Sequence, residues 1–361
     1  MIQTPVYSYD LTVLRRTLDK VTHAAGDFKV HYAVKANANP RILSEIARYG
    51  LGADCVSLGE IIAAHSAAIS ADKIVFAGVG KTDREITEAL NLGIRCFNVE
   101  SLPELQVIDE IAGQINLKAG VCLRINPNID AHTHHYITTG LAENKFGINL
   151  EQLDEVLAIA RGLKNVEFLG LHFHIGSQIL DLEPFIALCN KINALNRPEY
   201  KIINVGGGLG INYDNPGEMP DFQSYFDCFR RNLRLYSNQE LHFELGRSIV
   251  AQCGSLLTRV VYVKKGINKS FVICDGGMNA LIRPALYGAH HKIENISSKG
   301  LENTYDVVGP ICESSDVFGV DIKLPETHRG DILAIRSAGA YGETMASNYN
   351  LRELQSPVYE I

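Results

Sequence analysis

Short apolar or β-branched runs alternate with amphipathic segments from about residue 28 to residue 245. Such alternation is typical of strand–helix units around a parallel sheet, because each buried strand is followed by a helix that covers it. Eight runs repeat in this way: Val30–Val34, Ala53–Ser57, Ile74–Ala77, Cys96–Val99, Val121–Ile125, Leu169–His174, Ile202–Val205 and Leu241–Leu245. Most precede a helix candidate such as Pro40–Tyr49 or Leu102–Ile115. Eight such units predict an α/β fold, a (β/α)8 TIM barrel.

The pattern changes after about residue 255. Strand-like runs such as Leu257–Lys264 and Phe271–Cys274 are broken by Gly, Pro and Asn, with little helical periodicity. These runs predict a second, β-rich domain of barrel-like or sandwich-like form, and Pro5–Tyr9 reads as a strand that pairs with it. We expect residues 22–255 to form the barrel, and residues 1–21 and 256–361 to form the β-rich domain.

Composition narrows the classes of partner. The 361-residue chain has a net charge of −7 and no run of Lys or Arg, so we expect no nucleic-acid or membrane partner. No apolar run approaches the roughly 20 residues that span a membrane, and no signal peptide is recognisable, which favours a cytoplasmic protein. The eight cysteines form no C-x-x-C pair, so we expect most of them to be reduced and buried.

Polar residues fall where the predicted strands end. In a TIM barrel, catalytic groups gather at the C-terminal ends of the strands. Lys35 ends the first run, Asp54 lies in the second, His174 ends the sixth, and Gly206–Gly208 and Glu244–Arg247 lie at the seventh and eighth. Phosphate sites in such barrels commonly use the loops after strands seven and eight. A phosphorylated ligand is therefore expected.

Each of these residues also has a structural explanation. Burial would lower the pKa of Lys35 and leave a nucleophilic amine for a Schiff base, but a lysine at a strand end can also extend into solvent. The glycine triplet can approach a phosphate closely or simply form a tight turn. Glu244, within an apolar strand, needs a cationic partner, which a protonated pyridine nitrogen or a structural salt bridge would supply. Arg247 favours the phosphate interpretation.

Histidines raise the alternative of a metal site. His172 and His174 lie on one face of a predicted strand, and further histidines follow at His132, His134, His135, His290 and His291. A metal-dependent hydrolase would leave Lys35, the glycine triplet and Arg247 unexplained. An imidazole stacked on an aromatic cofactor would explain His174 without metal.

The β-rich part holds further candidates. Cys312, beside Glu313, could donate a proton to a carbanion or be an inert buried thiol. Arg283, Tyr287 and Tyr341 could bind a carboxylate or phosphate, or merely cap loops.

The order and spacing of these segments resemble one family. The matching segments are Tyr32–Asn37, Gly52–Ser57, Arg124–Pro127, Thr138–Gly140, Asn144–Gly147, His174–Gln178, Gly206–Gly210, Glu244–Arg247, Arg283–Tyr287, Cys312–Glu313 and Ala338–Gly342. Together they resemble the fold type III pyridoxal-phosphate decarboxylases and, within them, the diaminopimelate decarboxylases. The resemblance covers nearly the whole chain.

The resemblance implies a cofactor site for pyridoxal 5'-phosphate. Lys35 would hold the cofactor covalently, His174 would stack on its ring and Glu244 would pair with its pyridine nitrogen. Asp54 is included in the same cofactor site. The phosphate would rest on Ser177, Gly207, Gly208, Gly246 and Arg247, with Tyr341 nearby.

The resemblance also implies a reaction and a partner. The enzyme would decarboxylate meso-2,6-diaminopimelate to L-lysine and CO2, the last step of lysine biosynthesis, as a homodimer with shared active sites. Cys312 of the second subunit would reprotonate the carbanion. Arg247, Arg283, Tyr287 and Tyr341 would contact the substrate, with the distal carboxylate on the arginines and the distal ammonium on Glu313.

Three alternatives remain. The chain could decarboxylate a related basic amino acid or carboxynorspermidine, which would change only the distal pocket. It could be a catalytically silent homologue that binds a partner protein, although Lys35, Glu244 and Cys312 are all present. It could be the metal-dependent hydrolase.

Overall fold

The computed structural model describes residues 2–129 and 145–360, which fall into two compact units. The first comprises Leu18–Gly210 and Asp221–Gly246, and the second comprises Met1–Thr17, Ile211–Pro220 and Arg247–Ile361. Residues 211–220 thus group with the second unit, although the sequence predicts them to lie in the barrel. The expected domain ranges, 22–255 for the barrel and 1–21 with 256–361 for the β-rich domain, stay a prediction.

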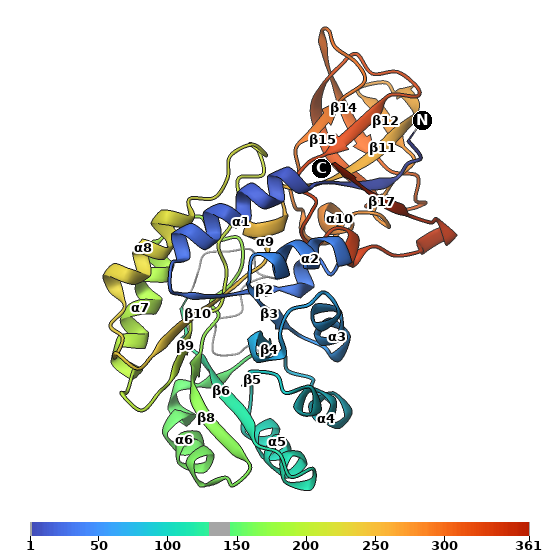
Figure 1. The fold of residues 1–361 in the computed structure, drawn as a ribbon. Coiled ribbons are helices and arrows are strands. Elements are labelled where there is room, and N and C mark those ends of the chain that lie inside the picture. Colours follow the sequence, from blue (N-terminus) through green and yellow to red (C-terminus); the bar gives the residue numbers. More distant parts are fainter. Residues whose placement is uncertain (1, 130–144, 361) are drawn as a thin grey trace. The chain divides into compact units, whose positions relative to one another are not determined.

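The first unit is a closed parallel barrel (Figure 1). Its strands follow the order β5-β4-β3-β2-β10-β9-β8-β6, and pairing of β6 with β5 closes the ring. Their bounds are β2 Lys29–Ala33, β3 Gly52–Cys55, β4 Ile74–Phe76, β5 Cys96–Val99, β6 Ala119–Asn126, β8 Val166–His172, β9 Ile202–Asn204 and β10 Glu240–Leu245. Each overlaps one of the eight predicted runs, so the TIM barrel is confirmed. Strand β7 (Ile148–Asn149) is not predicted from the sequence, since two residues show no periodicity.

Helices connect successive barrel strands, and several begin at a side-chain cap. Ser57, Thr82 and Ser101 each accept a hydrogen bond from the backbone N–H three residues later, which satisfies a donor that the first helical turn leaves unpaired. These caps fix where a helix starts after the strand before it. The connecting helices are α2 Pro40–Arg48, α3 Leu58–Ser66, α4 Asp83–Leu92, α5 Leu102–Gln114, α6 Leu153–Gly162, α7 Glu183–Leu195 and α8 Phe222–Asn232, while α1 Leu11–Ala25 precedes the first barrel strand.

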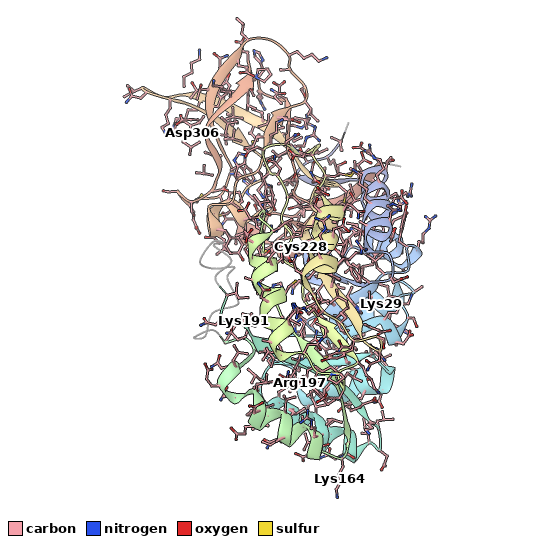
Figure 2. All side chains as sticks on the ribbon, turned by 90° about the vertical axis from the view of Figure 1, so that its left-hand side faces the viewer. Lys29, Lys164, Lys191, Arg197, Cys228 and Asp306 are labelled. Atoms are coloured by element: carbon pink, nitrogen blue, oxygen red, sulfur yellow. The ribbon has the colours of Figure 1, made fainter. Side chains whose placement is uncertain are left out.

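Alternate residues of β10 serve the two sides of the barrel wall. Phe243 is fully buried, and its ring lies 4.9 Å from that of Phe226 and 5.0 Å from that of Phe229, both on α8. Helix α7 joins the same aromatic cluster through Phe185, whose ring lies 5.0 Å from that of Tyr225. Figure 2 labels Lys191 on α7 and Cys228 on α8. Because neighbouring strand residues point to opposite faces, Glu244 points into the barrel.

The second unit is built on an eight-stranded mixed sheet. Its main path runs β13-β16-β11-β12-β14-β15, and β1 pairs antiparallel with β11 and parallel with β17. The strands are β1 Val6–Asp10, β11 Gly254–Lys265, β12 Ser270–Cys274, β13 Ile293–Asn295, β14 Glu302–Val308, β15 Val317–Pro325, β16 Ile332–Ile335 and β17 Gln355–Glu360. Two short helices, α9 (Arg247–Val250) and α10 (Arg283–Tyr287), belong to the same unit.

The β-rich second domain is therefore confirmed, including the pairing of the N-terminal strand with it. Seven of the eight cysteines are buried and Cys312 is exposed; none is in a disulfide. Within residues 2–129 and 145–360, no helix is long and apolar enough to cross a membrane.

We predict that Phe243→Ala lowers the free energy of unfolding by about 3–5 kcal/mol, because it empties the centre of the α8–β10 aromatic cluster. Urea denaturation of the cofactor-free protein would measure the change. Ile62→Ala serves as the control, since Ile62 is 51% exposed. A loss for Phe243→Ala no larger than that for the control would contradict this account of the barrel wall.

Candidate active site

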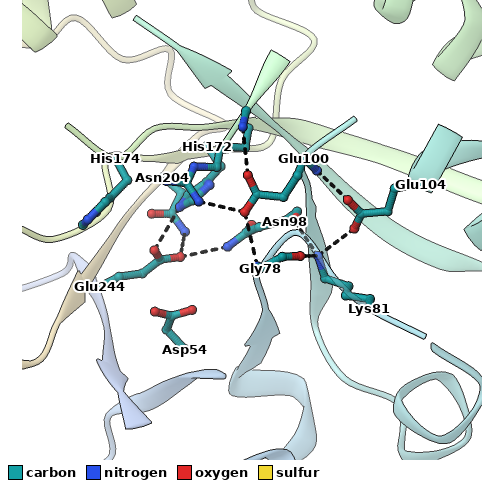
Figure 3. A network of polar contacts seen from close by, with 12 residues as sticks. Asp54, Gly78, Lys81, Asn98, Glu100, Glu104, His172, His174, Asn204 and Glu244 are labelled. Atoms are coloured by element: carbon teal, nitrogen blue, oxygen red, sulfur yellow. Dashed lines mark hydrogen bonds and ion pairs between the residues drawn. The ribbon is translucent and has the colours of Figure 1, made fainter. Parts of the chain in front are cut away.

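One buried carboxylate, that of Glu244, collects three hydrogen bonds inside the barrel (Figure 3). Its Oε1 accepts from Asn98 Nδ2 at 2.9 Å and from Asn204 Nδ2 at 2.7 Å. Its Oε2 lies 2.9 Å from His172 Nε2. The three partners come from β5, β9 and β8, so strands far apart in the sequence fix one side chain.

The surroundings of Glu244 keep it ionised. Burial acts to raise the pKa of Glu244, but its interaction with His172, which hydrogen-bonds to it, and the charge of Lys35 outweigh burial and hold that pKa below its ordinary value. His172 donates from Nε2, and its buried Nδ1 has no hydrogen-bond partner among the described residues, so a proton on Nδ1 would find no acceptor there. A buried anion held by neutral amide donors can still bind a further cation or N–H donor.

Lys35 and Asp54 lie next to each other at the ends of adjacent strands. Lys35 is in a short 3-10 helix (Val34–Ala36) after β2, and its Nζ lies 3.7 Å from Oδ2 of Asp54 on β3. The Lys35 side chain is 41% exposed, whereas that of Asp54 is 1% exposed. Burial and the nearby charge of Glu244 raise the pKa of Asp54 to about 7, against the opposing charge of Lys35. An accessible amine thus stands beside a buried carboxyl group.

The loops after β8 and β9 bring His174 against the glycine triplet. The backbone N–H of Gly207 donates to Nδ1 of His174 at 3.3 Å, so the imidazole proton is on Nε2. Burial and the positive charges of Arg124 and Lys35 lower the pKa of His174, which keeps the ring neutral. A side chain at Gly207 would place its Cβ 1.9 Å from the carbonyl oxygen of Glu244. Only glycine allows this approach, and it ties the triplet to β10.

Further polar contacts support the end of β5 and were not predicted from the sequence. Lys81 is 1% exposed and donates to Glu104 at 2.6 Å and to the carbonyl oxygens of Gly78 and Asn98. The Asn98 carbonyl is thereby held while its amide binds Glu244 (Figure 3). Lys81 therefore stabilises the Glu244 site from outside its immediate contacts.

The second unit brings together two buried guanidinium groups. The Tyr213 hydroxyl accepts from Arg247 Nη1 at 2.7 Å and from Arg283 Nη1 at 3.0 Å. Each arginine is 6% exposed. The Arg247 guanidinium also lies 5.0 Å from the centre of the Tyr341 ring. Two buried cations that share a neutral acceptor form a site that would bind an anion strongly.

Other predicted residues of this unit lie elsewhere in it or are less constrained. Cys312 and Glu313 are exposed, between β14 and β15, and the Tyr349 hydroxyl donates to Glu313. In the part of the chain that the structure describes, no hydrogen bond or ion pair joins either residue to Arg247 or Arg283. Tyr287 is half-buried at the end of α10.

Three of the histidines behind the metal hypothesis have other contacts. His172 binds Glu244, His290 pairs with Asp214 at 3.0 Å, and His291 binds Arg283. No group of three or more His, Cys, Asp or Glu residues suited to a metal is found over residues 2–129 and 145–360. His132, His134 and His135, like the Thr138–Gly140 segment, lie outside the described residues.

The residues that hold the predicted site residues in place are not predicted from the sequence. Asn98, Asn204 and Tyr213 are not singled out, and His172 and His291 enter only as metal candidates. An available signal was the presence of Asn98 and Asn204 in otherwise apolar strands, since a buried amide needs a partner. Tyr213 lies in a loop and gives no such signal.

Comparison with protein families places the barrel in a known group. Residues 11–251 match the model of the family described as pyridoxal-dependent decarboxylase, pyridoxal binding domain.

Individual relatives cover nearly the whole chain. A diaminopimelate decarboxylase of Bacteroides thetaiotaomicron is 58% identical over 98% of this chain and 94% of its own length. One of Vibrio cholerae is 44% identical over 97% of this chain and 85% of its own length. Among solved structures, diaminopimelate decarboxylase from Helicobacter pylori complexed with L-lysine has a TM-score of 0.92 at 44% identity, covering 99% of this chain and 91% of that one.

The raised pKa of Asp54 predicts that the free energy of unfolding depends on pH. In the folded protein the Asp54 carboxyl group keeps its proton up to about pH 7, whereas in the unfolded chain it loses the proton near its ordinary pKa of 3.8. Since the folded state binds the proton more tightly, the stability that Asp54 contributes is present below 3.8 and is lost as the pH rises to about 7. Asp54→Asn should therefore gain stability relative to the wild-type protein across that range, by an amount on the order of a few kcal/mol.

Urea denaturation of both cofactor-free proteins at several pH values would measure this gain. A difference between them that stays constant with pH would show that Asp54 is not held in its protonated form.

Proposed function

Because the chain belongs to the diaminopimelate decarboxylases, a group of pyridoxal-dependent decarboxylases, we propose that it converts meso-2,6-diaminopimelate to L-lysine and CO2. A relative of that name that matches almost the full length of both chains carries the proposal. The reaction would be the last step of lysine biosynthesis, and a cytoplasmic location and a homodimer are part of the same proposal.

The described residues fit pyridoxal 5'-phosphate. The cofactor has an aldehyde that needs an amine, a pyridine nitrogen that needs an anion, and a phosphate that needs donors. The barrel unit offers the amine of Lys35, the ionised carboxylate of Glu244 and the glycine loop after β9. Asp54 Oδ1 is buried with no hydrogen-bond partner among the described residues, which marks a polar site that protein groups do not complete.

In this proposal the barrel residues bind and tune the cofactor. Lys35 would hold it, His174 would stack on its ring, and Glu244 would keep a proton on its pyridine nitrogen. Backbone and side-chain donors at Ser177, Gly207, Gly208 and Gly246, with Arg247 and Tyr341, would hold the phosphate. When bound, pyridoxal phosphate supplies an electron-withdrawing ring that accepts the electron pair left by departing CO2. Asp54, whose Oδ2 lies 3.7 Å from Lys35 Nζ, would be a further residue of this cofactor site.

The residues of the second unit would select the substrate. The distal end of diaminopimelate is an amino acid, so its recognition needs a cation for the carboxylate and an anion for the ammonium. Arg283 and Arg247, with Tyr287 and Tyr341, would supply the first. Glu313 would supply the second, and its hydrogen bond from Tyr349 would orient the carboxylate.

Proton return would fall to Cys312, contributed by the second subunit of a homodimer. Two features support this role. The thiol is exposed, unlike the other seven cysteines, and its loop is held by Asp316, which accepts N–H bonds from Ile311 and Met278, both at 2.6 Å. A thiol on a fixed loop can deliver a proton to a defined carbon atom.

We predict that the purified protein with pyridoxal phosphate releases CO2 from meso-diaminopimelate but not from L-lysine, L-ornithine or L-arginine. Lys35→Ala should abolish the release, because it removes the amine that is proposed to hold the cofactor. Carbon dioxide release measures both. Release from another amino acid would keep the cofactor chemistry and overturn the distal assignments of Arg283 and Glu313. No release from any of them would refute the proposed enzyme.

Shared active sites predict complementation. When inactive Lys35→Ala and Cys312→Ala chains are mixed, half of the random dimers combine one chain of each kind, and each of these carries one intact site. Activity should then return to about a quarter of the wild-type value. Each variant alone serves as the control. No recovery after confirmed subunit exchange would place Lys35 and Cys312 of each site on one chain.

A further inference from the structure

Arg283 is buried without an acidic partner. Among the described residues, no carboxylate forms an ion pair with it, although the residue is only 6% exposed. Its two hydrogen-bond acceptors are neutral: the Tyr213 hydroxyl at 3.0 Å and Nε2 of His291 at 2.8 Å. Burying a charge in this way is costly unless a ligand repays it. The contacts thus hold Arg283 in place and leave its charge uncompensated.

The contacts of His291 define its protonation. Nδ1 lies 2.9 Å from the backbone carbonyl oxygen of Arg336, which can only accept, so the proton must be on Nδ1. Nε2 faces Arg283 Nη1, which can only donate, so Nε2 must carry the lone pair. His291 is therefore a neutral acceptor. Burial and the charge of Arg283 lower its pKa to about 3, in agreement with this tautomer.

The sheet fixes the position of His291. It lies two residues before β13, and Arg336 follows directly after β16, with Ile293 opposite Ile335 in the antiparallel pair. The backbone N–H of Arg336 also donates to the carbonyl oxygen of Lys292 at 2.8 Å. Since His291 and Arg336 flank the same strand pair, their contact holds the imidazole in a fixed position.

Both N–H groups of Arg283 Nη1 are used by Tyr213 and His291. The remaining edge of the guanidinium, made by Nε and Nη2, has no hydrogen-bond partner among the described residues. An edge with two parallel N–H groups can bind both oxygens of one carboxylate. Holding Nη1 in place therefore orients this edge before a ligand arrives.

We propose that His291 is a positioning residue that orients Arg283, with Tyr213 as second support, and thereby sets selectivity for substrates with a distal carboxylate. The inference rests on the proposed function. It goes further because it explains what orients the guanidinium group of Arg283. Losing one CO2 from diaminopimelate leaves L-lysine, which keeps the distal amino-acid end. The diamine 1,5-diaminopentane has the same carbon chain and no carboxylate.

The test compares His291→Leu, which removes the acceptor, with His291→Gln, whose side-chain oxygen can accept from Arg283. In the holoenzyme, His291→Leu should raise the KM for meso-diaminopimelate and weaken L-lysine binding by about tenfold or more, the usual effect of losing a hydrogen bond to a charged group. The kcat should change much less. Inhibition by 1,5-diaminopentane should not change, and His291→Gln should recover most of the loss.

His290→Leu is the matched control, since His290 is the neighbouring histidine but is 54% exposed. It should behave as the wild-type enzyme. Equal weakening of L-lysine and 1,5-diaminopentane by His291→Leu would show a merely structural role and overturn the proposal, as would an unchanged KM.

Tyr213→Phe gives a second test if His291→Leu does not fold, because it removes the other acceptor of Arg283 Nη1, together with an acceptor of Arg247. It should also weaken L-lysine more than the diamine, and equal effects would contradict the proposal. If the wild-type enzyme does not act on diaminopimelate, the proposed function fails. If it does and the variants keep the wild-type selectivity, only the role of His291 fails.

Discussion

The barrel site depends on one ionised carboxylate in an interior that would otherwise disfavour it. Asn98, Asn204 and His172 converge on Glu244 from three strands, and their hydrogen bonds compensate for its burial. Asp54 lies nearby and keeps its proton to about pH 7. Two buried carboxyl groups thus hold different charge states, because the described part of the barrel gives three donors to one and leaves an oxygen of the other without a partner.

In the second unit, buried positive charges are held by hydrogen bonds to neutral groups. Arg247 and Arg283 are buried around the hydroxyl of Tyr213, and His291 accepts from Arg283 as a neutral imidazole. In each unit, neutral hydrogen-bonding groups fix the direction of a charge without cancelling it. A charge held in this way can act on a ligand with little reorganisation when the ligand binds.

The sequence alone predicts the elements better than the contacts between them. Barrel strands are local apolar runs, and Lys35 and Glu244 are recognisable because they interrupt or end such runs. The partners of Glu244 are 40 to 146 residues away, so only the closed barrel brings them together. His291 shows the same limit: the sequence suggests a metal ligand, and the structure shows a support for Arg283. The roles of Cys312 and Glu313 stay predictions.

The ionisation of Glu244 is the central claim, and its carboxylate can be observed directly. The infrared difference spectrum between the wild-type cofactor-free protein and Glu244→Gln should contain a carboxylate band throughout the range from about pH 5 to 8. The account predicts that band and no protonated carboxyl band assigned to Glu244. A protonated Glu244 in that range would contradict it, because the barrel would then offer no anion to a pyridine nitrogen.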